Sequence, residues 1–235
     1  MKAARTILIA EDEADIRELI AFNLERESYV CRCAADGHHA IAELDTQVPD
    51  LVILDRMLPG ASGDEVLTRM RHDPRTSAVP VIMLTAKADE SDELVGFAIG
   101  ADDYVTKPFS IKALVARVGA LLRRAQGSTD DASTGIVRSG PVTLDPERQT
   151  VDVAGAAIML TLTEFRVLQT LVVADGRLRS RDQLIDAALG MHVAVTDRTI
   201  DVHVAALRKK LGTAARWIQT IRGAGYAWRR PTEAQ

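Results

Sequence analysis

Residues 51–63 read Leu-Val-Ile-Leu-Asp-Arg-Met-Leu-Pro-Gly-Ala-Ser-Gly. The stretch opens on four apolar residues, which is the pattern of a strand buried on both faces, and Asp55 follows directly. Pro59 and Gly60 then mark a loop. A carboxylate at the end of such a strand predicts an α/β domain in which Asp55 lies at the carboxyl edge of the sheet.

Three other short strand-like runs end in polar side chains in the same way. They cover residues 6–10, 79–84 and 103–106, and they are followed by Glu11-Asp12, by Thr85 and by Lys107-Pro108. Helical periodicity separates the runs, so the front half is predicted to be a doubly wound sheet of five parallel strands. Because the carboxyl ends of parallel strands converge on one crevice, folding should bring these polar groups together with Asp55.

The polar groups of this crevice suit phosphoryl chemistry. Several carboxylates at one place repel one another unless a divalent cation neutralises them. Asp55 is the candidate phosphoryl acceptor, and Asp12, with Glu11 acting through water, would hold Mg²⁺. Lys107 would supply a positive charge and Thr85 a hydroxyl for the phosphoryl oxygens.

The order and spacing of these residues, with Gly-Ala-Asp-Asp-Tyr-Val-Thr-Lys-Pro-Phe at 100–109, resemble the receiver domain of two-component response regulators. The resemblance runs from about residue 6 to residue 124. It implies a flavodoxin-like fold, a sensor histidine kinase as phosphodonor and a Mg²⁺ ligand from the backbone carbonyl of Met57. It also implies a cis peptide bond at Lys107-Pro108 and a switch role for Tyr104, which turns inward when Thr85 moves.

An aspartyl phosphatase is the enzymatic alternative. Phosphatases of the haloacid-dehalogenase type also use an aspartyl nucleophile with Mg²⁺, but they place it after the first strand and need a second Asp two residues on. Here Asp55 follows the third predicted strand, and position 57 is Met. A phospho-Asp without that acid should persist, so the sequence favours a switch over an enzyme.

Composition and charge separate the two halves of the chain. Its 235 residues suggest two domains, and no apolar run is long enough for a signal segment or a membrane span, so we expect a cytoplasmic protein without a membrane partner. Residues 1–124 hold 15 Lys and Arg against 21 Asp and Glu, a balance of −6. Residues 125–235 hold 14 against 12, a balance of +2, which suggests a polyanion partner for the second half alone.

The sequence predicts a receiver domain at 1–124, a flexible linker at 125–135 and a second domain at 136–235. The linker is assigned because it is polar, small and without periodicity. Beyond it come short β-like segments at 136–160, three helix patterns at 163–174, 181–189 and 196–211, and a hairpin at 217–228 around Gly223-Ala224-Gly225.

The third of these helix patterns has an apolar side and a basic side. Residues 197–211 read Asp-Arg-Thr-Ile-Asp-Val-His-Val-Ala-Ala-Leu-Arg-Lys-Lys-Leu, with a stripe of Ile200, Val204, Leu207 and Leu211. With residues 162–165 and 220–226, this helix resembles the winged-helix effector of OmpR/PhoB-type transcription factors over about 137–230. The resemblance implies an α+β winged helix-turn-helix domain that binds double-stranded DNA, with RNA polymerase as a further partner.

The resemblance also implies roles for single residues. Four side chains would contact phosphates: Arg198, His203, Arg208 and Tyr226. Val202 would contact a thymine methyl and Arg222 the minor groove, with Lys209 on the same outer face. Where many relatives have basic residues this chain has Ala205-Ala206. We therefore expect the hairpin at 217–228, the wing, to contribute more of the specificity for DNA sequence. Two alternatives are a merely solvated basic face and a receiver scaffold whose tail binds only protein.

Relatives with this architecture form a homodimer on phosphorylation through the fourth helix, the fifth strand and the fifth helix. Asp103 and Arg117 match one of the ion pairs between the subunits, whereas Glu93 and Ala113 replace another. We therefore expect a weakened but intact dimer. The sequence as a whole predicts a response regulator in which phosphorylation of Asp55 promotes dimerisation and sequence-specific DNA binding to regulate transcription.

Overall fold

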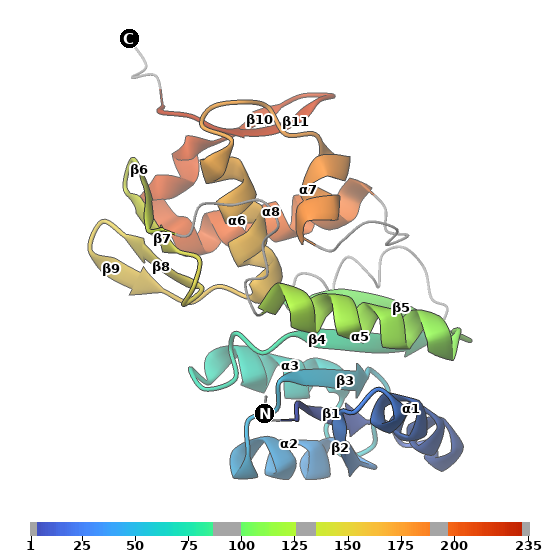
Figure 1. The fold of residues 1–235 in the computed structure, drawn as a ribbon. Helices are drawn as coiled ribbons and strands as arrows, with labels where there is room; N and C mark the ends of the chain where they lie inside the picture. Colours follow the sequence, from blue (N-terminus) through green and yellow to red (C-terminus); the bar gives the residue numbers. More distant parts are fainter. Residues whose placement is uncertain (1–3, 87–99, 126–134, 189–196, 232–235) are drawn as a thin grey trace. The chain divides into compact units, whose positions relative to one another are not determined.

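The computed structural model describes residues 4–86, 100–125, 135–188 and 197–231. The chain divides into two compact units, Met1–Ala125 and Gln126–Gln235 (Figure 1). The helix predicted at 91–99 and most of the predicted linker lie outside the described residues.

The first unit is built on one parallel sheet. Its elements are β1 (Thr6–Ala10), α1 (Ala14–Arg26), β2 (Val30–Ala34), α2 (Gly37–Thr46), β3 (Leu51–Asp55), α3 (Gly63–His72), β4 (Val81–Ala86), β5 (Asp103–Lys107) and α5 (Ile111–Ala125). The strand order is β2-β1-β3-β4-β5, and every pairing is parallel. The predicted doubly wound, five-stranded parallel sheet is therefore confirmed.

The arrangement of strands places a crevice at the expected edge. The sheet grows in one direction from β1 to β2 and in the other from β1 to β3, so the crossovers reverse beside β1. Ligands of open α/β sheets bind at this switch point, outside the carboxyl ends of the strands. Helices cover both faces, with α1 beside α5 and α2 beside α3, which explains why every residue of β3 is buried (Figure 1).

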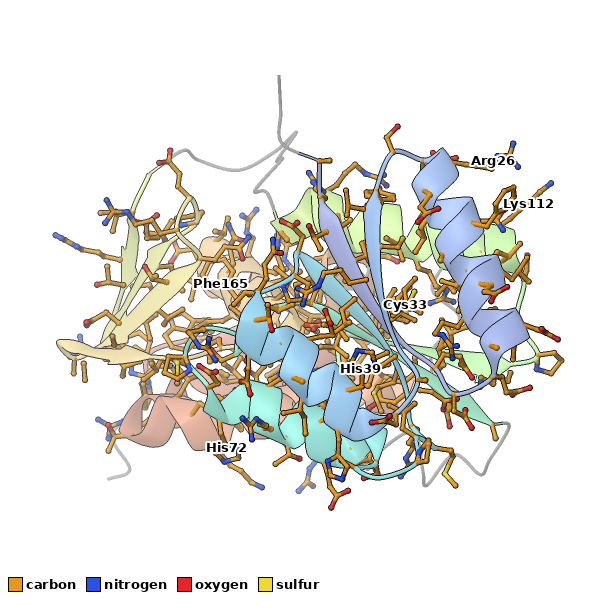
Figure 2. The ribbon with its side chains drawn as sticks, turned by 90° about the horizontal axis from the view of Figure 1, so that it is seen from below. Arg26, Cys33, His39, His72, Lys112 and Phe165 are labelled. Atoms are coloured by element: carbon orange, nitrogen blue, oxygen red, sulfur yellow. The ribbon has the colours of Figure 1, made fainter. Side chains whose placement is uncertain are left out.

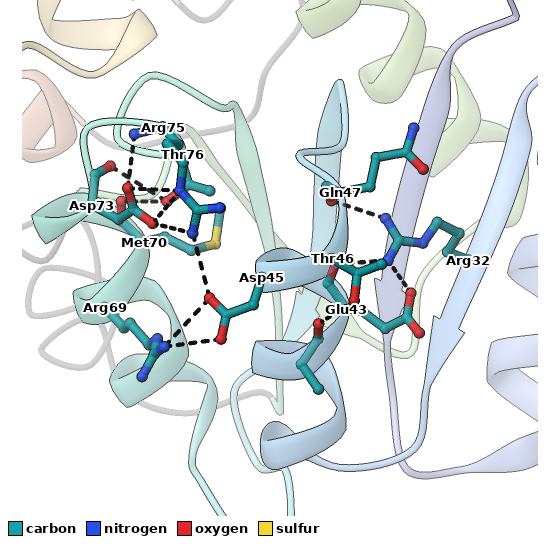
Figure 3. A network of polar contacts seen from close by, with 11 residues as sticks. Arg32, Glu43, Asp45, Thr46, Gln47, Arg69, Met70, Asp73, Arg75 and Thr76 are labelled. Atoms are coloured by element: carbon teal, nitrogen blue, oxygen red, sulfur yellow. Dashed lines mark hydrogen bonds and ion pairs between the residues drawn. The ribbon is translucent and has the colours of Figure 1, made fainter.

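Surface ion pairs connect the crossover helices at one side of the sheet. Arg32 of β2 donates hydrogen bonds to the carbonyls of Glu43 and Gln47, at 2.6 and 2.9 Å, and pairs with the Glu43 carboxylate (Figure 3). Asp45 of α2 pairs with Arg69 of α3 at 3.0 Å and with Arg75 at 3.5 Å (Figure 3). Exposed pairs such as those of Asp45 contribute only about 0–1 kcal/mol each.

A buried arginine has a larger structural role. The Arg71 guanidinium lies 2.9 Å from Asp102 Oδ2, and Asp102 is fully buried. Arg71 also donates to the carbonyls of Gly100, Ser77 and Val79 at 2.8–3.0 Å. It thereby fixes the chain that leads into β4 and β5, the strands that carry Thr85 and Lys107.

The two cysteines lie on β2, at the edge of the sheet, and Cys33 is labelled in Figure 2. Burial raises the pKa of Cys31 to about 12 and also raises the pKa of Cys33. Because the thiolate is the reactive form, a raised pKa lowers the reactivity of both thiols at neutral pH. Among the described residues, no helix has the length and apolar character needed to span a membrane.

The second unit combines a small antiparallel sheet with three helices and a hairpin. Its elements are β6 (Val137–Ser139), β7 (Val142–Asp145), β8 (Thr150–Val153), β9 (Ala156–Ile158), α6 (Leu162–Val173), α7 (Arg181–Ala188), α8 (Asp197–Leu211), the 3₁₀ helix η1 (Gly212–Trp217), β10 (Ile218–Ile221) and β11 (Gly225–Trp228). Strands β6 to β9 pair antiparallel, and β10 and β11 form the hairpin. The predicted α+β winged-helix architecture is confirmed.

The core of the second unit lies between its helices and the hairpin. Phe165 of α6 is buried there with the apolar stripe of α8 (Figure 2). Trp217 and Trp228 stack with ring centroids 5.5 Å apart, and Trp228 Nε1 donates a hydrogen bond to Ser139 Oγ at 3.0 Å. At Gly140, where φ is +57°, an added Cβ would lie 2.4 Å from the Trp217 ring, so only glycine allows this close approach.

Candidate metal centre and nucleic-acid interface

Strand ends in the first unit bring acidic side chains and a lysine into one pocket. Glu11, Asp12 and Asp55 each offer a carboxylate oxygen, and these oxygens all lie within 4.8 Å of one another. Lys107 Nζ lies 2.6 Å from Asp55 Oδ2 and 2.8 Å from Glu11 Oε1. Asp55 and Lys107 are the last residues of β3 and β5, and Glu11 follows β1, so the parallel register itself creates the cluster.

The pocket holds more negative than positive charge. Burial raises the pKa of Glu11 to about 7, with the charge of Asp55 adding to the rise and the hydrogen bond from Lys107 opposing it. Burial alone would lower the pKa of Lys107, but its hydrogen bonds to Asp55 and Glu11 outweigh that effect and raise the pKa.

One oxygen of the pocket is left open for a ligand. Glu11 Oε2 is buried and has no hydrogen-bond partner among the described residues. Glu13 Oε1 lies 3.7 Å from Lys107 Nζ, on a side chain that is 64% exposed, so it stands at the rim. Carboxylate oxygens grouped in this way suit a hard divalent cation such as Mg²⁺.

Three further residues were predicted for the pocket: Met57, Thr85 and Tyr104. Met57 contributes a contact that the sequence does not reveal, because its backbone N–H donates to Asp55 Oδ1 at 2.9 Å. The buried Thr85 hydroxyl donates to the Ala86 carbonyl at 3.1 Å. Tyr104 is only 7% exposed, so its side chain is buried. The Lys107-Pro108 peptide bond is cis, as predicted.

The two residues of the predicted dimer face contact each other within one chain. Arg117 Nη1 of α5 donates to both carboxylate oxygens of Asp103, each at 2.8 Å. An ion pair between subunits would therefore require these partners to be exchanged. Glu93 lies outside the described residues, whereas Ala113 is exposed on α5.

In the second unit, several predicted DNA contacts lie on accessible surface. Lys209 and Ala205 are exposed on α8, and Val202 is partly exposed on the same helix. Arg222 is exposed in the turn between β10 and β11. Arg198 belongs to the first turn of α8, but its side chain lies outside the described residues.

The burial of His203 counts against its predicted phosphate contact. Its side chain is 1% exposed, and burial lowers its pKa to about 4, so the imidazole is neutral near pH 7. Position 203 lies three residues after Ile200 and four before Leu207, which places it at the border of the buried stripe. Helical periodicity alone could not decide on which side of that border it falls.

Tyr226 and Arg208 are occupied by contacts inside the second unit. The Tyr226 hydroxyl donates to Asp201 Oδ1 at 2.6 Å, and the residue is 4% exposed. Arg208 Nη2 donates to Ile218 O and Thr220 Oγ1, both at 2.8 Å. Sequence reasoning did not identify Asp201, although an acid inside a basic helix face was a visible signal.

Comparison with known families agrees with this arrangement of two units. Residues 7–119 match the family described as the response regulator receiver domain, and residues 155–228 match transcriptional regulatory protein, C terminal. The phosphate regulon regulator PhoB of Pseudomonas aeruginosa is 44% identical over 223 residues, which cover 94% of this chain and 96% of that protein. RegX3 of Mycobacterium tuberculosis is 43% identical over 224 residues, covering 94% of this chain and 97% of that protein. The chain belongs to the OmpR/PhoB family of response regulators.

Solved structures support the same architecture for this response regulator. DrrB of Thermotoga maritima, described as an OmpR/PhoB homologue, is 29% identical with a TM-score of 0.51, covering 97% of this chain and all of that one. A RitR mutant reaches a TM-score of 0.76 at 25% identity, with the same coverage.

Family membership decides between the alternatives that the sequence left open. The chain is a two-component response regulator that acts in transcription, and the matched families are not enzyme families, which removes the aspartyl phosphatase. The receiver domain implies a sensor kinase as partner, and the C-terminal domain implies DNA binding rather than a tail that contacts only protein.

Proposed function

We propose that a sensor histidine kinase phosphorylates Asp55, and that this promotes dimerisation and sequence-specific DNA binding. The observation that carries the proposal is the pocket itself: Lys107 Nζ lies 2.6 Å from Asp55 Oδ2, beside carboxylates whose oxygens lie within 4.8 Å of one another. The compartment proposed is the cytoplasm, where a regulator of this kind meets its DNA.

In this proposal Asp55 attacks phosphorus of a phosphohistidine. The P–N bond breaks as the new P–O bond forms, and the electron pair stays on the departing imidazole nitrogen. The N–H of Met57 orients the carboxylate through its 2.9 Å hydrogen bond, and Lys107 neutralises charge on the phosphoryl oxygens. The Thr85 hydroxyl can turn from Ala86 O to a phosphoryl oxygen, and in the proposed switch the buried Tyr104 responds to that movement.

The pocket fits Mg²⁺ by the chemistry of its donors. Glu11, Asp12 and Asp55, with the backbone carbonyl of Met57, are the proposed ligand set, and the open Glu11 Oε2 supports it. When bound, Mg²⁺ supplies positive charge to the phosphoryl oxygens.

The proposed domains are 1–124 and 136–235, joined by a linker at 125–135. The division of the chain between Ala125 and Gln126 supports them. Within the second domain we propose Arg198 as a phosphate contact, and Val202, Lys209 and Arg222 as contacts that contribute to sequence choice, because the last three are at least partly exposed. RNA polymerase is a proposed further partner, on the family resemblance.

Mass spectrometry after incubation with acetyl phosphate and Mg²⁺ tests the phosphorylation. We expect one added phosphoryl group in the natural chain and none in Asp55→Asn. Asp45→Asn, which removes an exposed carboxylate from α2, is the matched control and should be modified normally. The proposal fails if Asp55→Asn gains the group or the natural chain does not.

Sedimentation velocity tests the dimer face. Phosphorylation should raise the sedimentation coefficient of the natural chain, and Asp103→Arg should prevent the increase because it places two cations together at positions 103 and 117. Adding Arg117→Asp restores opposite charges and should recover part of the dimer. A phosphorylated Asp103→Arg chain that dimerises normally would refute this face.

A further inference from the structure

Asp201 joins three elements of the second unit. It lies on α8 and accepts a hydrogen bond from the Tyr226 hydroxyl of β11 at 2.6 Å. It also accepts from Arg181, the first residue of α7, whose Nε lies 2.8 Å and whose Nη2 lies 3.4 Å from its carboxylate oxygens. One carboxylate therefore connects α8, the proposed recognition helix, with the preceding helix α7 and with the β10–β11 hairpin, the wing.

The Tyr226 ring is held by the same group of residues. The guanidinium carbons of Arg181 and Arg208 lie 5.3 and 5.7 Å from the ring centroid, within the range of cation–π contacts. Arg208 continues the connection by donating to Ile218 O and Thr220 Oγ1 of β10. Both strands of the wing are thus tied to α8 through side chains.

Backbone contacts hold the wing against the segment that precedes α7. Arg179 and Tyr226 exchange two N–H···O hydrogen bonds, of 2.8 and 2.9 Å. An added Cβ at Gly225 would lie 2.1 Å from Arg179 O, and φ there is +139°, so the approach requires glycine. The wing therefore has one fixed docking position, which Asp201 and its partners extend to α8.

The charge of Asp201 needs an explanation on a surface that meets DNA. It is the only acidic residue in the sequence between 198 and 230, a stretch with eight Lys and Arg. An unpaired carboxylate beside a phosphate backbone would weaken binding by repulsion. Here the Arg181 guanidinium offsets its charge and the Tyr226 hydroxyl donates a hydrogen bond to it, so its repulsion is small and its role in holding the wing remains.

We propose that Asp201 is a positioning residue for DNA recognition, which sets the wing, and with it Arg222, at a fixed place relative to α8. Arg181, Arg208 and Tyr226 act with it by geometry, not as contacts to phosphate. The inference rests on the proposed DNA binding. It implies that the choice of DNA sequence depends on a carboxylate that, by its charge alone, would weaken DNA binding.

Whether Asp201→Asn strengthens or weakens DNA binding decides between a repulsive carboxylate and a positioning one. If the carboxylate only repels phosphates, its removal tightens binding to all DNA and steepens the dependence on salt. If it positions the wing, specific binding weakens, and we expect the ratio of specific to non-specific affinity to fall about tenfold. Asp182→Asn is the matched control, because it removes the same charge from an exposed position on α7.

The experiment is fluorescence anisotropy with full-length phosphorylated protein, using an operator fragment selected from genomic DNA and a scrambled fragment at several salt concentrations. Tyr226→Phe, which keeps the ring and removes only the hydroxyl, should lower the specificity ratio as Asp201→Asn does. The double variant should be no worse than Asp201→Asn alone, since both substitutions affect the same Tyr226–Asp201 hydrogen bond. Arg208→Gln should lower the ratio with the salt slope unchanged.

Arg198→Ala supplies the comparison for a true phosphate contact. It should weaken both fragments alike and reduce the salt slope by about one unit. The proposal is overturned if Arg208→Gln behaves like Arg198→Ala, or if Asp201→Asn binds DNA more tightly than Asp182→Asn.

A separate measurement on the free protein keeps this inference independent of DNA binding. Burial and the bond to Asp201 raise the pKa of Tyr226 to about 12, and ultraviolet titration should show the value fall in Asp201→Asn. An unchanged Tyr226 titration would refute the contact itself. A natural chain that binds no DNA at any salt concentration would instead refute the proposed function.

Discussion

The two units treat clustered charge in opposite ways. In the first, Glu11 and Asp55 share Lys107, the carboxylate of Asp12 lies beside theirs, and one buried oxygen of Glu11 has no protein partner among the described residues. In the second, Asp201 meets a guanidinium and a hydroxyl that together satisfy it. Where carboxylates outnumber their cationic partners, the site suits a ligand. Where a carboxylate is paired within the protein, its role is structural. Counting partners therefore separates two roles that residue type alone does not distinguish.

The first unit also contains a matched buried pair, and its removal should have the largest effect. Arg71→Met leaves Asp102 buried without its cation and removes donors from three carbonyls. We expect the free energy of unfolding of the first unit to fall by about 3–5 kcal/mol. Urea unfolding followed by circular dichroism measures the change.

Arg75→Ala is the control for this prediction. Arg75 lies four residues further along and pairs with Asp73 and Asp45 on the surface, so its loss should cost about 0–1 kcal/mol. Equal costs for the two variants would show that burial does not separate structural pairs from surface pairs here.

The buried His203 should make the stability of the second unit depend on pH. Its pKa is about 4 in the folded chain against an ordinary value of 6.5, so the unfolded chain binds the proton more readily. Stability should therefore fall as pH drops from about 6.5 to about 4, by up to roughly 3 kcal/mol.

Thermal unfolding across this pH range tests the sensitivity. His203→Gln should remove the part of the pH dependence that His203 causes. His39→Gln, at an exposed position on α2 of the first unit, should not. If the two variants lose stability in parallel with the natural chain as pH falls, His203 is not the group that titrates.

These cases show what the sequence could and could not predict. Asp55, Glu11 and Lys107 were predictable because strand ends follow from periodicity, and parallel strands necessarily share one edge. The side-chain directions on α8 were not, since His203 lies at the border of an apolar stripe and its burial depends on neighbouring elements. The hydrogen bond between Asp201 and Tyr226 joins residues 25 positions apart, and no local pattern encodes it.

Removing Lys107, which among the described residues is the cation paired with the carboxylates of Glu11 and Asp55, should make the acid pocket a stronger metal site. In Lys107→Ala the carboxylates of Glu11 and Asp55 lose their hydrogen-bonded ammonium, so a divalent ion no longer competes with it for their charge. We expect Mg²⁺ to bind roughly tenfold more tightly, about 1.4 kcal/mol, while the response to phosphorylation is lost. Isothermal titration calorimetry measures the affinity.

Lys112→Ala removes an exposed lysine from α5 and should leave the Mg²⁺ affinity nearly unchanged. Weaker binding in Lys107→Ala than in Lys112→Ala would mean that the lysine supports the metal site, and the idea of excess charge awaiting a ligand would not hold.

The smallest expected effect concerns sequence choice in the second unit. With Ala205 and Ala206 on the outer side of α8, the helix lacks guanidinium groups there, and a bidentate arginine–guanine contact would contribute about 1–3 kcal/mol of discrimination. The exposed Arg222 of the wing should therefore matter more than Lys209. We expect Arg222→Ala to lower the ratio of specific to non-specific affinity several-fold, and Lys209→Ala to lower it less.

Competition binding with matched and scrambled DNA measures both ratios, with Arg216→Ala on η1 as a control that removes an exposed cation away from the hairpin turn. A ratio that falls for Arg222→Ala but not for Arg216→Ala identifies the wing as a reader of sequence, held in place by the matched charges around Asp201. If Arg222→Ala leaves the ratio unchanged, discrimination must come from the few side chains that α8 exposes, Val202 and Lys209 among them. The contacts of Asp201 would then hold a wing that contributes to the affinity for DNA but not to the choice of sequence.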